Sequence, residues 1–452
     1  MAQAGDVSGH DGPLDVLIIG GSLGGLMSGI LLKRSGHNVR ILEQAASSER
    51  EGLAAGIGLA FQVKRFFETE DRLKDKPMGI LNSGVSIVDD NLRVRYKLAL
   101  DMNLTSWDSA YYRARWNFDG HQSAHCPETP LAAAASEGYG EYLTGKSVQK
   151  VEDVQGRLTA FVTDAKTGAT EQYSGDIVIA ADGANSTLRR QLHPNLQREE
   201  PGYVIWRGTI PTSELSQDVL DKIENRPVIY PGPQTYCVIY TIPGENGSLA
   251  QGTRHINMAW YFWPSKASLE EIMTDVDGHH HRSTVPKGKM RPEVWQPQVE
   301  QARRLLPKPL VSLVENIQSP FVSVVSSITA PNAVYFNNRL FMIGDALTQS
   351  QPNIGMGTSL AANAAISLVN EVICPENGEG SPPRLSPERI EAWERKVLQE
   401  NEITRCRSVS FASWYLNSWP LIGYYFARYY AKLYWQYYFG GREKKWEVLR
   451  RV

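Results

Sequence analysis

The sequence contains few cysteines, and their spacing suits neither a disulfide framework nor a zinc site. The four are Cys126, Cys237, Cys374 and Cys406, and they lie far apart without a Cys-x-x-Cys pair. Disulfide-rich domains and zinc sites both depend on closely spaced cysteines, so both classes are disfavoured. This usage is typical of a protein in a reducing compartment, and we predict no metal site.

An excess of basic residues is also absent. The chain has 47 lysines and arginines against 49 aspartates and glutamates, a formal net charge of −2. A surface that binds nucleic acid needs concentrated positive charge, so we expect no nucleic-acid partner. Residues 1–12 lack the apolar run of a signal peptide. We therefore expect a cytoplasmic protein, with peripheral membrane contact as an open alternative.

The chain does contain a clear strand–helix–strand pattern near its start. Residues 14–19 form an apolar run suited to a strand buried on both faces, and residues 39–42 form a second one. Between them, residues 20–25 read Gly-Gly-Ser-Leu-Gly-Gly and lead into a helical pattern. Such a turn brings a helix N-terminus to a pyrophosphate, and Glu43 at the end of the second strand can accept ribose hydroxyls. This pattern predicts a dinucleotide site in which Ser22 replaces the usual middle glycine.

Two later segments repeat the arrangement of a buried strand that ends in polar and glycine residues. Residues 177–189 run from an apolar strand into Asp-Gly-x-x-Ser-x-x-Arg. Residues 340–346 form a strand ending in Gly-Asp, followed by Pro-Asn-Ile-Gly-Met-Gly at 352–357 and a helix of small residues. Asp345 can accept from a ribityl hydroxyl, and the glycine backbone can approach a flat ring closely. The N-terminus of that helix would stabilise negative charge on a reduced flavin.

These three motifs in this order resemble the class A FAD-dependent flavoprotein monooxygenases, the aromatic hydroxylase superfamily. The segment 55–58 is similar to the family's strand near the flavin. Residues 105–108, 112–113, 203–208 and 257–261 look like the branch that contains 2,6-dihydroxypyridine hydroxylase. Ser359 and Ala364 depart from the family pattern, which usually has Asn and Asp there.

The resemblance implies a function and a set of cofactor-binding residues. In this family NADH or NADPH reduces FAD, oxygen adds at flavin C4a, and the hydroperoxide hydroxylates or epoxidises a small electron-rich ring such as a phenol, hydroxypyridine or indole. The expected contacts to the cofactor are made by Gly20, Ser22, Leu23, Gly25, Glu43, Gln44, Gly56, Ile57, Arg113, Asp182, Gly183, Arg189, Gly344, Asp345, Pro352, Gly355, Met356 and Gly357. Asp182 would serve both FAD binding and its reduction by NAD(P)H.

Arg207 is the candidate for an active-site side chain outside the cofactor motifs. It lies in a predicted strand beside Trp206, where it could orient an anionic or phenolic substrate or donate to the departing hydroperoxide oxygen. An ion pair at the surface or between domains is the alternative. Tyr203 and Tyr261 could line the same face, although aromatic residues in sheets more often serve packing.

The order of the predicted elements indicates an α/β fold in which a Rossmann-like FAD-binding domain of the glutathione-reductase type is interrupted by a mainly antiparallel substrate domain. We assign residues 14–85, 105–200 and 325–374 to the first domain and residues 86–104 and 201–324 to the second. Residues 375–387 resemble a linker. Residues 386–452 are expected to form C-terminal helices.

The C-terminal segment holds 14 aromatic residues between Phe411 and Phe439. A helix is expected over 421–439, with Arg428, Lys432 and Gln436 forming a polar stripe that argues against a membrane span. Packing across the two domains is the favoured role. Peripheral membrane contact and dimerisation through this helix are the alternatives.

Two other functions are compatible with the same motifs. A flavoprotein of this fold could run a different reaction, as a reductase or an oxidase. A non-catalytic binding protein could also retain the fold, although intact Glu43, Asp182, Arg189 and Asp345 argue against it.

Overall fold

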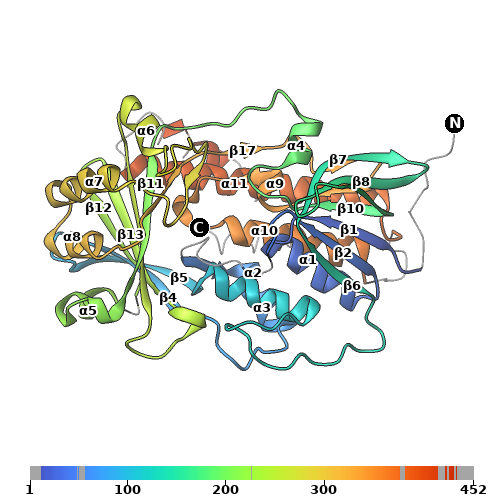
Figure 1. Ribbon diagram of the computed structural model, residues 1–452, viewed down its shortest axis with the longest axis horizontal. Helices are drawn as coiled ribbons and strands as arrows, with labels where there is room; N and C mark the ends of the chain where they lie inside the picture. The colour runs from blue at the N-terminus through green and yellow to red at the C-terminus, as the bar shows by residue number, and fades with distance from the viewer. Residues whose placement is uncertain are drawn as a thin grey trace.

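The structure is a computed structural model that describes residues 12–47, 49, 56–224, 226–376, 382–415, 423–424, 427–431 and 434. Two large sheets organise this part of the chain and lie toward opposite ends of the molecule (Figure 1). The six-stranded sheet contains, in spatial order, β18 (Val334–Tyr335), β19 (Leu340–Met342), β10 (Ile177–Ala180), β1 (Asp15–Ile19), β2 (Asn38–Glu43) and β6 (Gly140–Thr144).

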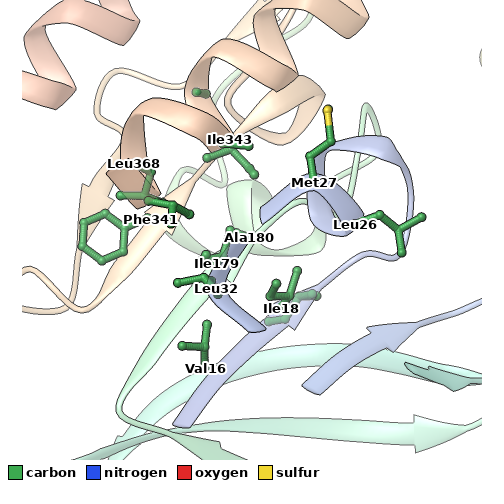
Figure 2. Close-up of a cluster of buried hydrophobic side chains, with 14 of the residues drawn as sticks. Val16, Ile18, Leu26, Met27, Leu32, Ile179, Ala180, Phe341, Ile343 and Leu368 are labelled. Atoms are coloured by element: carbon green, nitrogen blue, oxygen red, sulfur yellow. The ribbon is translucent and has the colours of Figure 1, made fainter. Parts of the chain in front are cut away.

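The first strand lies in the middle of the six-stranded sheet, as its apolar run predicts. It pairs in parallel with β10 on one side and β2 on the other. Both faces of a parallel sheet are covered, so continuous apolar runs are favoured there. Figure 2 shows Val16 and Ile18 of β1 near Ile179 of β10, in the same cluster of buried side chains as Leu26 and Leu32.

Helices and a small sheet cover the six-stranded sheet. The buried side chains of α1 (Leu23–Arg34), α3 (Trp107–Asp119) and α10 (Gly357–Ser367) join its core, and so do those of β7 (Lys146–Val154) and β8 (Arg157–Asp164), which pair with β9 (Thr170–Gly175) in a three-stranded sheet. Helix α10 is the predicted helix of small residues that follows the third motif. A π-helical turn, Leu368–Ile373, follows it.

The nine-stranded sheet has two different faces. Its spatial order is β15 (Thr284–Val285), β16 (Phe321–Val324), β11 (Val204–Pro211), β14 (His255–Phe262), β13 (Thr235–Ile242), β12 (Val228–Gly232), β4 (Ile80–Val88), β5 (Val94–Ser106) and β3 (Gly56–Ala60). Trp206 and Trp260 point to one face, where α5 (Gln217–Ile223), α7 (Pro292–Leu305) and α8 (Lys308–Glu315) pack. In Figure 1 these helices lie at the end of the molecule away from the six-stranded sheet. The other face carries Tyr236 and Tyr261, which contact Phe411 and Ala412 near the C-terminal end of the chain.

The predicted antiparallel region is present, because β11, β14, β13 and β12 pair in antiparallel fashion. The parallel pairing of β12 with β4 was not expected. The remaining elements are α2 (Phe61–Glu70), α4 (Thr187–Leu192), α6 (Lys266–Ile272), α9 (Gly344–Leu347), β17 (Ile328–Thr329) and β20 (Thr348–Gln349).

A long helix, α11 (Pro387–Tyr415), follows toward the C-terminus. Its predicted start is confirmed: the Ser386 hydroxyl accepts from the Arg389 N–H at 3.4 Å, and Pro387 is the first helical residue. Ala412 and Phe411 pack on Tyr236 and Tyr261 of the nine-stranded sheet. Most of the helix predicted over 421–439 lies outside the described residues. Within those residues, no helix has both the length and the apolar character needed to cross a bilayer.

Candidate flavin site

The first glycine turn approaches the Asp-Gly motif with no space for a side chain. Gly20 has φ +102°, and a Cβ there would lie 2.2 Å from the Ala181 carbonyl oxygen and 2.9 Å from the Asp182 Cα. Gly25 packs as closely on the turn itself, since its Cβ would lie 2.1 Å from the Gly20 carbonyl oxygen. Neither position has room for a side chain, and the first two motifs meet at the carboxyl ends of adjacent parallel strands, where α/β folds bind ligands.

The turn places the start of α1 next to this junction. Ser22 is the N-cap, but its hydroxyl does not bond to the helix, and Leu23 is buried as the first helical residue. The Tyr142 hydroxyl donates to the Gly21 carbonyl at 2.9 Å, and a Cβ on Gly21 would lie 2.2 Å from that hydroxyl oxygen. Sequence analysis missed Tyr142, because its strand is distant along the chain from the turn.

Glu43 lies at the end of β2, where the sequence places it. Its Oε2 accepts from the Gly21 N–H at 2.9 Å and its Oε1 accepts from the Ala45 N–H at 2.8 Å. These bonds hold the carboxylate against the glycine turn. Gln44 follows it and is exposed.

Asp182 has one satisfied and one orphaned carboxylate oxygen. Its Oδ2 accepts from the Thr187 N–H at 2.7 Å, whereas its buried Oδ1 has no hydrogen-bond partner among the described residues. Burial raises the pKa of this carboxyl group. Gly183 beside it has φ +75° and open space around its Cα. A buried acceptor without a donor is costly, and a ligand hydroxyl or amide would satisfy it.

Arg189 joins the second motif to the third. Its guanidinium donates to the carbonyl oxygens of Asp345 at 2.9 Å and Ala346 at 2.8 Å, and also to that of Ala184. Burial lowers the pKa of this guanidinium to about 10. Arg189 therefore holds two cofactor motifs together, because its guanidinium nitrogens donate to backbone carbonyl oxygens of both.

The Gly-Asp motif meets the start of α10. Gly344 has φ +58°, and its Cβ would lie 3.3 Å from the Cβ of Ala361 on that helix. A Cβ on Gly357 would lie 4.0 Å from Oδ1 of Asp345. The Asp345 side chain is exposed, yet the surrounding protein desolvates its carboxyl group and raises its pKa to about 6, against the opposing charges of Arg189 and Arg198.

The loop before α10 is open on one side and anchored on the other. Pro352 and Gly355 are exposed, Met356 is half-buried, and Gly355 has φ +65° with nothing within 4 Å of an added Cβ. The anchor is Asn353, which is buried. Its Oδ1 accepts from the hydroxyls of Tyr203 at 3.0 Å and Tyr236 at 2.8 Å. Its Nδ2 donates to the Ser408 carbonyl at 3.1 Å, so the loop is tied to α11.

The two tyrosines proposed for the substrate face are both buried. The Tyr203 hydroxyl also donates to Oε1 of Gln351 at 3.0 Å. The Tyr261 ring stacks on Tyr236 with centroids 4.1 Å apart. The packing role, which sequence analysis favoured, accounts for these contacts.

Gly56, in the segment that resembles the family's flavin strand, is clamped by the nine-stranded sheet. Its N–H donates to Oδ1 of Asn257 at 2.9 Å, and its carbonyl accepts from the hydroxyl of Tyr240 at 2.7 Å and from Arg207 at 3.4 Å. A Cβ on Gly56 would lie 2.5 Å from the Tyr240 ring. Ile57 next to it is half-buried. Arg207 therefore lies close to this strand.

Arg113 is used by the protein itself. It is buried, its Nη1 forms an ion pair with Asp71 at 2.7 Å, and both terminal nitrogens donate to the carbonyl of Lys76. This gives Arg113 a structural role in anchoring the loop after α2, and its contact to a flavin stays a prediction.

Three consecutive histidines, at residues 279–281, are the one run of potential metal ligands in the sequence. His279 and His280 are exposed, and Nε2 of His281 lies 2.7 Å from Oδ2 of Asp275. In the described ranges no group of three or more His, Cys, Asp or Glu side chains is arranged to hold a metal ion.

Comparison with known proteins identifies the relatives of this chain. A family model described as FAD binding domain-like matches residues 201–327. The chain is 26% identical over 387 residues to 2,6-dihydroxypyridine 3-monooxygenase from Paenarthrobacter nicotinovorans, which covers 85% of this chain and 87% of the relative. It is also 26% identical over 371 residues to the FAD-dependent monooxygenase atnJ from an Arthrinium species, covering 79% of this chain and 75% of the relative.

A solved structure has the same fold. The 2,6-dihydroxypyridine-3-hydroxylase from Arthrobacter nicotinovorans superposes with a TM-score of 0.69 at 23% identity, covering 86% of this chain and 90% of that one.

Replacing Gly20 with alanine should abolish FAD retention, because the new Cβ would meet the Ala181 carbonyl. We expect the purified variant to lose its flavin absorbance. Gly168→Ala is the matched control, since Gly168 also has positive φ (+70°) but open space around it. The left-handed backbone alone costs roughly 1–2 kcal/mol, so the control should be slightly less stable and still yellow. Equal flavin content in both variants would contradict the clash.

Replacing Asn353 with alanine should loosen the loop before α10. The Tyr236 hydroxyl would lose an acceptor, at about 1–3 kcal/mol, whereas Tyr203 keeps Gln351, so we expect weaker FAD binding and a shifted flavin spectrum. Fluorescence titration of FAD into the apoprotein measures both. Asn332→Ala, at an exposed position, is the control. An unchanged FAD affinity in Asn353→Ala would show that the network does not hold the loop.

Replacing Asp345 with asparagine should remove a loss of folding stability that occurs when the Asp345 carboxyl group becomes charged. Because its folded-state pKa of about 6 lies above the ordinary value of 3.8, the charged form is disfavoured in the folded apoprotein. Wild type should therefore lose stability relative to Asp345→Asn as the pH rises from about 4 to 7. Partial solvation of the exposed side chain limits the difference in Tm to about 2–4 °C. The measurement is Tm between pH 4 and 7 for wild type and Asp345→Asn, with Asp75→Asn at an exposed position as the control. Equal changes of Tm with pH in wild type and Asp345→Asn would contradict the prediction.

Proposed function

We propose that this chain, which is similar to FAD-dependent monooxygenases, is a class A enzyme that uses NADH or NADPH and oxygen to hydroxylate or epoxidise a small electron-rich aromatic or heteroaromatic compound. The observation that carries this proposal is that three motifs meet beyond the carboxyl ends of β1, β10 and β19. These motifs are residues 20–25, 182–189 and 344–357. Phenols, hydroxypyridines and indoles are the substrate classes we consider.

The residues at this edge suit FAD. Gly20 and Gly25 keep the turn compact enough for the N-terminus of α1 to face a pyrophosphate. Glu43, held beside Gly21, is suited to ribose hydroxyls, and the orphaned Oδ1 of Asp182 offers a buried acceptor. Asp345 and the exposed loop at 352–355 are suited to the ribityl chain and the ring edge.

The chemistry that FAD supplies when bound is the passage of reducing equivalents from the nicotinamide to oxygen. The chain's own residues do the rest. The N-terminus of α10, which begins at Gly357, would stabilise negative charge on a flavin bound in front of it. Asn353 fixes the loop in front of that helix. Arg207, next to Gly56, orients the substrate, and the buried Tyr203 and Tyr261 support that side of the sheet.

We propose the domain division given by the sequence: residues 14–85, 105–200 and 325–374 bind FAD, residues 86–104 and 201–324 bind the substrate, and residues 386–452 form a C-terminal unit. The membership of β1, β2, β6, β10 and β19 in one sheet supports the first assignment, and that of β11 to β16 in the other supports the second. Strands β3 and β4 both belong to the nine-stranded sheet, on either side of β5. Residues 56–85 would therefore form the junction between the two domains.

The test is NAD(P)H oxidation by the FAD-loaded enzyme over a panel of phenols, hydroxypyridines and indoles, with isotopically labelled oxygen. We expect one class to stimulate NAD(P)H oxidation and its product to gain one labelled oxygen atom. A flavin that is readily reduced without any oxygenated product would favour a reductase or oxidase instead. A colourless protein that takes up no FAD would favour a non-catalytic binding protein.

A further inference from the structure

We propose that Arg207 and Lys287 together form a cationic subsite that binds the carboxylate or phenolate of an anionic aromatic substrate. This inference rests on the proposed function, because it names the substrate class of the same site. Lys287 belongs to none of the three cofactor motifs, and nothing in its local sequence marks it as a binding residue.

The two cations come from different segments and meet at one aromatic ring. Arg207 lies on β11 and is paired in register with Phe321 on β16. Its Cζ is 5.4 Å from the centroid of the Phe321 ring. Lys287 follows β15, the neighbour of β16, and its Nζ is 5.9 Å from the same centroid. The ring thus supports both charged groups through cation–π contacts.

Among the described residues, neither cation has a carboxylate within ion-pair distance, and the charge of Asp108 reaches Lys287 only from farther away. Both side chains are half-buried, and neither forms an ion pair with any residue in the part of the chain that the structure describes. Burial lowers the pKa of Lys287, Asp108 opposes this, and the charge of Arg207 lowers the pKa further. Two like charges in a partly desolvated place are unfavourable without a counter-ion. An anionic ligand between them would remove this cost.

The position of the pair connects it to the flavin site. Arg207 donates to the carbonyl of Gly56 at 3.4 Å, and Gly56 begins β3. At the end of the same strand, the carbonyl of Ala60 accepts from the hydroxyl of Ser359 on α10 at 3.0 Å. The opposite face of the nine-stranded sheet is filled by Trp206, Trp260 and the helices packed on them. The face that carries Arg207 is therefore the one directed toward the proposed cofactor.

The two side chains suit an oxyanion with more than one acceptor. The guanidinium of Arg207 is a planar donor that matches a carboxylate in bidentate fashion, and Lys287 adds a point charge from a second direction. The phosphate of NADPH offers the same chemistry from another source. Binding of the substrate anion and binding of the NADPH phosphate can be distinguished, because NADH lacks that phosphate.

The test compares matched acid and amide pairs built on phenol, pyridine and indole rings, such as 3-hydroxybenzoate with 3-hydroxybenzamide. Binding to the FAD-loaded enzyme is measured by perturbation of the flavin spectrum. We expect wild type to bind an acid at least about tenfold more tightly than its amide, and Lys287→Met to lose that preference. Lys287→Arg should restore most of it. Lys289→Met is the control, since Lys289 is exposed and paired with Asp277.

The outcomes separate this inference from the proposed function. Equal binding of acids and amides by wild type, or an unchanged preference in Lys287→Met that retains its FAD, would overturn the subsite. A loss confined to NADPH over NADH would assign the two cations to the nicotinamide cofactor and also overturn it. If acids bind through Lys287 but no compound gains oxygen, the subsite stands and monooxygenation fails. If neutral rings gain oxygen and acids do not bind, monooxygenation stands and the subsite fails.

Discussion

Gly20 and the Ala181–Asp182 backbone lie so close together that no side chain fits between them. This contact ties the ends of two parallel strands, β1 and β10, which are remote in sequence but adjacent in the sheet. The start of α1 can face the same edge only because Gly25 packs on the turn just as closely. Arg189 then extends the junction to the end of β19 by bonding to the backbone of Asp345 and Ala346. The whole candidate cofactor site depends on this chain of backbone contacts.

The second sheet is joined to that edge through β3 and the loop before α10. The Gly56 peptide is held by side chains of the nine-stranded sheet, and Ala60 of the same strand is held by Ser359 of α10. Asn353 links the loop to two sheet tyrosines and to α11. Polar bonds at these buried positions are costly to break, because each lost partner leaves a desolvated group. The face of the sheet that carries Arg207 is thereby kept in a defined position next to the flavin motifs.

Sequence patterns were most informative where local chemistry decides the structure. The apolar runs at 14–19 and 177–180 predicted central parallel strands, and the glycine spacing predicted a tight strand-to-helix turn. They were least informative for residues whose role depends on a distant partner. The ion pair of Arg113 with Asp71 and the hydrogen bonds around Asn353 follow from no motif in the sequence. Tyr142 reaches Gly21 from a strand about 120 residues later along the chain, as the pairing of β2 with β6 dictates.

The sequence by itself determined the fold class and the order of the three cofactor motifs, because hydrophobic periodicity and the residue types of turns are local properties. Only the tertiary structure decided which side chains share a site. It placed two cations, Arg207 and Lys287, next to one phenylalanine ring, and it placed β3 in the second sheet. Such juxtapositions arise from strand pairing between segments far apart in sequence. The local sequence of one segment does not predict how close it lies to the other segment in space.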